Sequence, residues 1–202
     1  MTRVIAMQLP HLTRSDLMSL EQYSTARREF RARVLEHKRN RNLALGPNAT
    51  WSFEDQLTMQ YQVQEMLRVE RIFEAEAIQE ELDAYNPLIP DGRNWKATFL
   101  LEFTDVDERR RRLAQLKGVE DRCWVQVAGC ERVWAIADED LERENDDKTS
   151  SVHFLRFELT PEMCEQMKAG AALAAGIDHE SYRQEVASVP QNVRDSLAKD
   201  LR

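Results

Sequence analysis

The sequence predicts an α+β fold in which N-terminal helices and a long acidic central helix pack on a mainly antiparallel sheet. Helical spacing of apolar residues dominates the first half of the chain, whereas period-two alternation dominates the second half. A length of 202 residues with 42% hydrophobic residues is enough for one good core. We therefore expect one domain over residues 1–202, with a helical arm at about 13–45, an α+β core at about 48–180 and a C-terminal helix at about 190–201.

The first half contains the predicted helices. Thr13 and Asp16 form a capping-box pattern that predicts a short helix from about 14 to 22. Ser24 can cap an amphipathic helix over residues 24–41, whose apolar positions recur at helical spacing and whose other face is basic. Alternating apolar residues from Trp51 to Val63 predict strand structure across a Glu54-Asp55 turn, followed by a helix from about 60 to 84.

The second half supplies the sheet. A loop with two prolines, residues 85–92, precedes a strand at 96–103, a helix at 105–117, a hairpin at 122–128 and 131–137, and a strand at 151–159. Thr160-Pro161 starts another helix, a stretch of small residues covers 170–176, and a last helix covers 190–201. We expect the hairpin and the two long strands to form one antiparallel sheet. Its inner face would carry Phe99, Leu101, Leu155 and Phe157.

Charge is unevenly distributed along the chain. The formal net charge of −8 argues against a nucleic-acid binder, because neutralising phosphates requires a basic face. Residues 1–46 carry nine basic and four acidic residues, whereas 51–91 carry two and ten. This segregation predicts that the helix at 24–41 docks on the helix at 60–83 through several ion pairs; the alternative is that its basic face binds an anion or an acidic partner. The run Arg109–Arg112 follows acidic residues four positions earlier, which is typical of a solvated helix face.

Location and redox state follow from composition. No apolar run approaches the roughly 20 residues that span a bilayer, and the N-terminus lacks the pattern of a signal peptide. Cys123, Cys130 and Cys164 show no zinc-finger spacing and fit reduced thiols. The sequence thus predicts a cytoplasmic, acidic protein that does not bind a membrane. No P-loop, GxGxxG, GxSxG or HExxH motif is present, so whether the protein is an enzyme stays open.

Glu65 stands out among the acidic residues of the central helix. On a helical wheel it lies in the apolar arc with Val69, Ile72 and Phe73. A carboxylate in such a place must be paired, bonded, metal-bound or protonated. Two interpretations of Glu65 remain open: it forms a structural ion pair with Arg68 or Arg156, or it belongs to a functional site. The ExxH pairs of di-iron bundles are missing, which excludes a ferritin-like centre.

Two histidines are further candidates. His153 shares a strand face with apolar residues, so it is either a satisfied core residue or a ligand. Asp178 and His179 follow a turn of small residues, with Tyr182 just beyond. The complete set of candidate ligand-binding residues is Glu65, Arg68, Tyr85, Asn86, His153, Arg156, Asp178, His179 and Tyr182. No cofactor is predicted, although a divalent metal on Glu65, His153 or His179 is possible.

Four stretches carry a family resemblance. They are residues 62–71 (QVQEMLRVER), 81–90 (ELDAYNPLIP), 153–159 (HFLRFEL) and 176–179 (GIDH). These stretches resemble a bacterial domain-of-unknown-function family, number 3501, over roughly residues 12–201. The resemblance implies association with redox metabolism or peroxide defence, with a rubrerythrin-like protein or an iron–sulfur oxidoreductase as partner. None of the three cysteines belongs to these motifs.

The sequence leaves two functions open. The first is an accessory or binding protein of a cytosolic redox system, without a redox cofactor of its own and with a homodimer as one option. The alternative is a small-molecule enzyme or metal sensor that uses a Glu/His pocket. Convergence of Glu65, His153 and His179 would favour the alternative, and their dispersal into separate ion pairs would favour the first.

Overall fold

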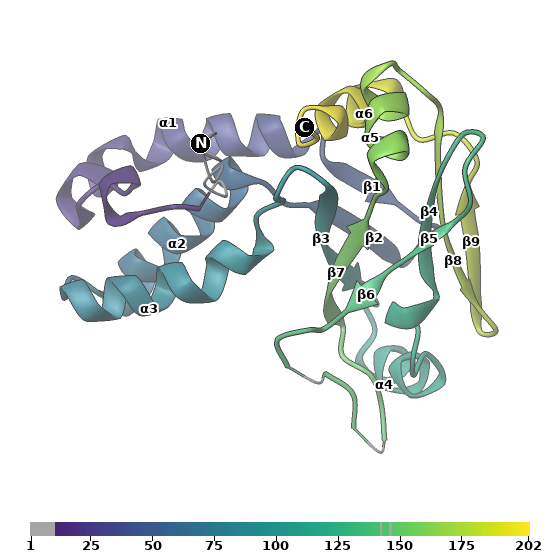
Figure 1. The fold of residues 1–202 in the computed structure, drawn as a ribbon. Coiled ribbons are helices and arrows are strands. Elements are labelled where there is room, and N and C mark those ends of the chain that lie inside the picture. Colours follow the sequence, from purple (N-terminus) through teal and green to yellow (C-terminus); the bar gives the residue numbers. More distant parts are fainter. Residues whose placement is uncertain (1–10, 142, 146) are drawn as a thin grey trace, which may run out of the picture.

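The computed structural model describes residues 11–141, 143–145 and 147–202. Its helices and strands form an α+β fold with two antiparallel sheets, as the sequence predicts in class. Three helices extend to one side of the two sheets, and the remaining helices cover the ends of the sheets (Figure 1). Within the described residues, no helix combines the length and the apolar character needed to cross a bilayer.

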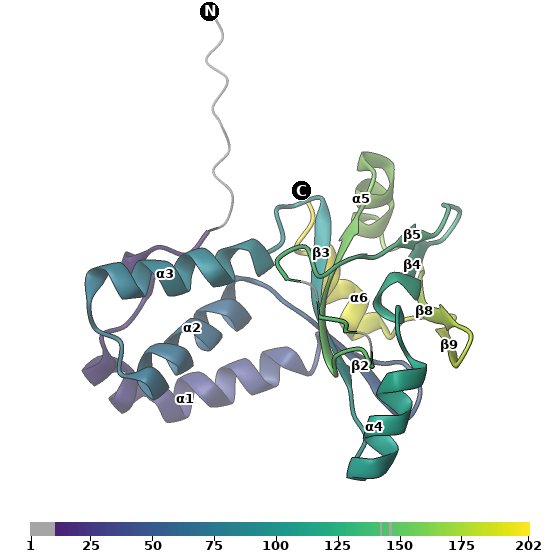
Figure 2. The same ribbon diagram turned by 90° about the horizontal axis from the view of Figure 1, so that it is seen from below.

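The helical unit consists of α1 (Leu20–Lys38), α2 (Gln56–Glu70) and α3 (Ala75–Tyr85), flanked by 3-10 turns at Arg14–Asp16 and Asn86–Leu88. Figure 2 shows the three helices side by side. Their apolar sides enclose one cluster around Val63, Leu67 and Leu82, and a second cluster that Tyr23 and Val34 of α1 supply. The predicted docking of the helix at 24–41 is confirmed by the α1–α2 contacts. Several ion pairs with residues 60–83 were expected, whereas among the described residues Arg27 with Glu65 is the one such pair.

Several predicted boundaries in this unit are wrong. Ser19 caps α1, which starts at Leu20, four residues before the expected start, and only a 3-10 turn forms at Arg14–Asp16. Asp55 accepts a hydrogen bond from the Thr58 amide and thereby starts α2 where strand was expected. The expected helix from 60 to 84 is two helices, because Arg71 adopts a left-handed conformation with φ of 56° and ends α2.

The first sheet has the order β1-β2-β3-β7-β6, with all neighbours antiparallel. Its strands are β1 (Asn42–Ala44), β2 (Ala49–Phe53), β3 (Asn94–Leu101), β7 (Val152–Glu158) and β6 (Ile136–Ala137). Phe99 and His153 are register partners at the centre of the sheet. The four residues expected on the inner face, Phe99, Leu101, Leu155 and Phe157, are all buried, as predicted.

The second sheet has the order β5-β4-β8-β9 and is also antiparallel. It comprises β4 (Cys123–Val127), β5 (Val133–Trp134), β8 (Leu173–His179) and β9 (Tyr182–Val186). The predicted single sheet is therefore wrong, because β4 pairs with β8 rather than with β3 or β7. The second arm of the expected hairpin crosses from one sheet to the other at Ala135, pairing as β5 with β4 and as β6 with β7.

One hydrophobic core lies between the two sheets and includes residues of both. Helices α5 (Pro161–Lys168) and α6 (Gln191–Ala198) lie at one end of the sheets and α4 (Val106–Gln115) at the other (Figure 1). The small-residue stretch has a packing reason within β8. A Cβ on Gly176 would lie 2.5 Å from the indole of Trp124, so only glycine fits there.

Candidate functional site

Glu65 is held by an ion pair inside the helical unit. Both oxygens accept bonds from Arg27, at 2.7 and 2.9 Å, and Oε1 also accepts from the Tyr23 hydroxyl at 2.7 Å. Arg68 adds a bond of 3.2 Å. The Arg27 bonds, with help from Tyr23 and Arg68, lower the pKa of Glu65 to about 2. Of the two expected partners, Arg68 is present and Arg156 is not, because Arg156 lies on β7.

The environment of Glu65 differs from the predicted apolar arc. Val69 and Phe73, which were expected beside it in that arc, are 57% and 70% exposed. The buried side of α2 is formed instead by Met59, Val63 and Leu67, four positions apart. Glu65 therefore lies at the edge of the apolar face, within reach of the arginine on α1.

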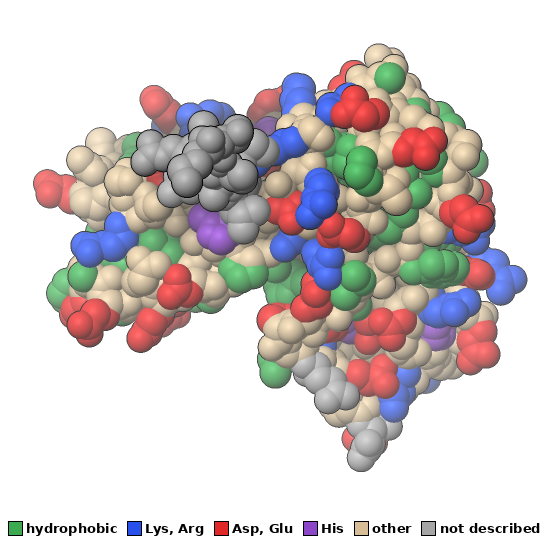
Figure 3. All heavy atoms as spheres, in the orientation of Figure 1, with side chains coloured by type: hydrophobic (Ala, Val, Ile, Leu, Met, Phe, Trp, Pro, Cys, Tyr) green, Lys and Arg blue, Asp and Glu red, His purple; other side chains and the backbone are tan. Residues whose placement is uncertain are grey.

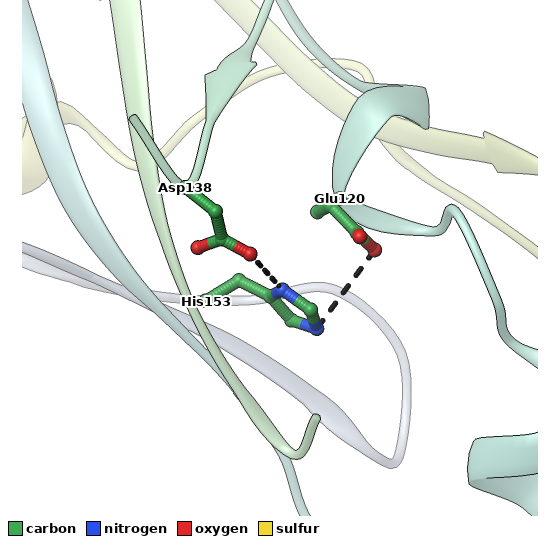
Figure 4. A group of neighbouring side chains, drawn as sticks. All are labelled: Glu120, Asp138 and His153. Atoms are coloured by element: carbon green, nitrogen blue, oxygen red, sulfur yellow. Dashed lines mark hydrogen bonds and ion pairs between the residues drawn. The ribbon is translucent and has the colours of Figure 1, made fainter. Parts of the chain in front are cut away.

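His153 is fully buried in β7 and lies between two carboxylates, as Figure 4 shows. Its Nδ1 is 2.6 Å from Oδ2 of Asp138, and its Nε2 is 3.8 Å from Oε2 of Glu120. The Thr149 hydroxyl and the Ser150 carbonyl each lie 3.1 Å from Nε2. We call Glu120, Asp138 and His153 the His153 cluster; one ligand atom from each lies within 4.8 Å of the others.

The two carboxylates of the His153 cluster are placed by short local structures. Glu120 belongs to a 3-10 turn, Glu120–Arg122, before β4, and it is 8% exposed. Its Oε2 has no hydrogen-bond partner, and burial raises its pKa. Asp138 follows β6 with a left-handed φ of 47° and also accepts bonds from the Phe154 amide and from Arg143.

The three candidates around His179 do not form a common site. His179 Nε2 lies 3.0 Å from the Lys117 carbonyl, and its Nδ1 accepts from the Ser181 amide. Asp178 binds Arg183 at 2.8 Å, while the buried Tyr182 donates to the Leu45 carbonyl at 2.7 Å. Each residue thus has a separate structural partner.

Glu65, His153 and His179 do not converge. They lie on α2, β7 and β8, and they share none of the hydrogen-bond partners given above. The single Glu/His pocket that would combine these three residues is therefore absent from the part of the chain that the structure describes.

A cavity of about 890 Å³ lies where the end of α3 meets the outer side of β3 and β7; we call it the junction pocket. In Figure 3, acidic and basic side chains alternate with apolar ones over this junction. The pocket lining includes two of the candidates, Tyr85 and Arg156. Asn86 is buried, is not part of the lining, and bonds the backbone of Leu12. The lining residues are Asp83, Ala84, Tyr85, Pro87, Leu88, Asp91, Asn94, Lys96, Glu139, Asp140, Phe154, Leu155, Arg156 and Glu158.

The charges of the junction pocket are mostly engaged with one another. Arg156 binds Glu139 at 2.7 and 2.8 Å and Glu158 at 2.7 Å. Lys96 donates to the Pro87 carbonyl, and burial followed by the positive charge of Arg156 lowers the pKa of Lys96. Five carboxylates and two cations line the cavity, an excess of three negative charges.

Comparison with known proteins places the chain in a family. The sequence model of a family described as "Protein of unknown function (DUF3501)" matches residues 11–201. The chain belongs to this family. No curated protein matches it. It is similar to a crystal structure of a "novel protein of unknown function" from Burkholderia pseudomallei K96243, with a TM-score of 0.90, 49% identity, and coverage of 95% of this chain and 99% of that chain.

The family resemblance predicted from the four sequence stretches is thus confirmed, and neither description states an activity. For this DUF3501 chain the sequence indicated His153 but neither of its carboxylate neighbours. Glu120 and Asp138 lie 33 and 15 positions before His153, in segments rich in charge. No sequence spacing links these two carboxylates with His153, because they become neighbours only when the two sheets pack.

Proposed function

We propose that this protein is an accessory binding protein whose ligand occupies the junction pocket. The observation that carries the proposal is the pocket itself, whose volume falls within the range of about 300–1,000 Å³ typical of small-molecule sites. The dispersal of Glu65, His153 and His179 into separate bonds supports a binding role over an enzyme built on those residues.

The lining indicates the chemical class of the ligand. Tyr85, Leu88 and Phe154 provide an apolar wall. Asp140 is neutralised by two bonds from Arg143, which still leaves an excess of two negative charges in the cavity. An organic cation with an apolar body matches both features, because a buried positive charge must be paired and the body gains from leaving water.

Charge-matched probes test this proposal. We expect tryptamine and hexylamine to raise the melting temperature and to shift amide resonances of pocket residues, whereas indole-3-propionate and hexanoate do not. Added salt should weaken amine binding. Glu139→Gln should weaken it severalfold, while Glu165→Gln on the exposed surface of α5 should leave it unchanged. Equal binding of amines and carboxylates, or none of either, would overturn the assignment.

The physiological setting is part of the proposal and is supported only by the family resemblance. We propose a cytoplasmic redox or peroxide-defence system in which this protein contributes no redox cofactor. A pull-down from native lysate should retain a rubrerythrin-like protein or an iron–sulfur oxidoreductase, and repeated failure to retain either would contradict this setting.

A further inference from the structure

The His153 ring is surrounded by more acceptors than a neutral imidazole can satisfy. The contact of 2.6 Å with Asp138 makes Nδ1 the proton-bearing nitrogen of a neutral ring. Its Nε2 lone pair then faces the Ser150 carbonyl at 3.1 Å and Oε2 of Glu120 at 3.8 Å, neither of which donates while Glu120 is ionised. The Thr149 hydroxyl can donate to this lone pair, but a neutral ring still leaves Oε2 of Glu120 without a donor, and a cation between these atoms would satisfy it.

A second observation points to the same place. Glu120 is only 8% exposed, and its Oε2 is buried without a hydrogen-bond partner. Leaving such an oxygen unpaired is unfavourable, which makes it a ready ligand. Thr149, 1% exposed, presents its hydroxyl to the same nitrogen at 3.1 Å.

We propose that Nε2 of His153, a carboxylate oxygen of Glu120, the Thr149 hydroxyl and the Ser150 carbonyl bind one divalent transition-metal ion, with Asp138 orienting the imidazole. Two ligands about 2.1 Å from a tetrahedral ion lie roughly 3.4 Å apart. The observed separations from Nε2, 3.1, 3.1 and 3.8 Å, bracket this value. A carboxylate that holds the far nitrogen of a metal-binding histidine is the usual arrangement of such sites.

The donor set selects among ions. One imidazole with three oxygen donors suits Zn²⁺ or Mn²⁺ better than it suits Mg²⁺, because Mg²⁺ prefers oxygen ligands alone. Since His153 is fully buried, the ion would enter during folding and would contribute to the stability of the folded protein.

The test uses the full chain without a histidine tag, unfolded with chelator and refolded with ZnCl₂, MnCl₂ or MgCl₂. We expect about one Zn²⁺ or Mn²⁺ per chain after dialysis and a higher melting temperature than in the metal-free protein, with no effect of Mg²⁺. Glu120→Gln should reduce the affinity at least tenfold. Asp138→Asn should reduce it by about 10- to 100-fold, and asparagine tolerates the left-handed backbone there.

Matched controls separate this site from adventitious binding. Glu54 is also a buried glutamate with an unpartnered Oε2, and His179 is a second buried histidine. Glu54→Gln and His179→Asn should bind the ion as the wild type does. Absence of retained Zn²⁺ and Mn²⁺ in the wild type would overturn the proposal. Equal binding by Glu120→Gln and Glu54→Gln would overturn it as well.

Discussion

At the scale of single residues, Glu65 shows what a carboxylate at the edge of an apolar face requires. Its need for a partner follows from the sequence, since an ionised group in that position must be bonded. The main partner, Arg27, is 38 positions away on another helix, and spacing along one helix could not identify it. The same limit applies to Glu120, whose partner His153 becomes a neighbour only when the two sheets pack.

The low pKa of Glu65 leads to a prediction on pH-dependent stability. A folded-state pKa of about 2 lies below the unfolded value of about 4.5, so the stabilisation is present above pH 4.5 and is lost as pH falls toward 2. The shift corresponds to at most about 3 kcal/mol, and the exposure of Arg27 and Arg68 reduces it to about 1–2 kcal/mol.

We therefore expect Glu65→Gln to lower the free energy of unfolding by about 1–2 kcal/mol at pH 7 and by about half as much at pH 3. Urea denaturation at both pH values measures this difference. The control is Glu70→Gln, an exposed position on the same helix. A loss that stays the same at pH 3 would show that the ion pair is not its source.

At the scale of elements, the differences between the expected and the observed boundaries have physical causes. The apolar residues Met59, Val63 and Leu67 lie four positions apart, a spacing that fits a helix and also falls on alternating positions. The hydrogen bond from the Thr58 amide to Asp55 caps a helix and thereby favours helix over strand here. The break after Arg71 has no glycine or proline to announce it, because the left-handed residue there is an arginine.

Gly176 provides an element-scale prediction for the second sheet. Its added Cβ would approach Trp124 to 2.5 Å and the backbone oxygen of Gln184 to 2.9 Å. Gly176→Ala should therefore lower the free energy of unfolding by about 1–3 kcal/mol, as overpacking does. Ala174→Ser, which adds one atom at a half-buried position of the same strand, should change it by less than about 0.5 kcal/mol. Chemical denaturation of both variants checks this, and equal effects would contradict the packing argument.

At the scale of the whole molecule, the fold class and the approximate order of helices and strands could be predicted from the sequence, but the division of the strands into two sheets could not. Helical and alternating periods separate correctly along most of the chain, which is why the α+β class is confirmed. Strand pairing depends on contacts between segments such as β4 and β8, about 50 positions apart. Apolar alternation specifies the buried face of a strand but not its neighbour.

A homodimer stays a prediction, and the tip of the helical unit is the surface on which to test it. Val69 and Phe73 are exposed there beside a cavity of about 460 Å³ lined by apolar residues such as Leu67 and Ile72. If copies associate through this tip, sedimentation equilibrium should show a dimer that Phe73→Glu converts to monomer, whereas Trp134→Glu on the second sheet does not. A wild-type monomer at all concentrations would contradict the prediction.

Arg41 couples the helical unit to the two sheets. It is 1% exposed and lies three residues after the end of α1. Its guanidinium donates to the carbonyls of Phe53 and Glu54, each at 2.9 Å, and to Asp200 beyond α6 at 2.6 Å. One side chain thus connects the end of α1, the start of α2 and the C-terminal segment.

Removing this connection should affect cooperativity as well as stability. Arg41→Met leaves Asp200 and two carbonyls buried without their partner, which should cost about 3–5 kcal/mol. Because the helical unit has its own apolar clusters, we expect it to unfold separately from the sheets in this variant. Far-ultraviolet circular dichroism and tryptophan fluorescence should then report different urea midpoints, whereas the wild type should show coincident midpoints. The four tryptophans lie at positions 51, 95, 124 and 134, all in the sheets, so fluorescence follows the sheets alone.

Arg41→Lys, which retains the charge but loses the forked geometry, should give an intermediate loss of stability with coincident midpoints. Coincident midpoints in Arg41→Met would show that other contacts suffice to join the helical unit to the sheets.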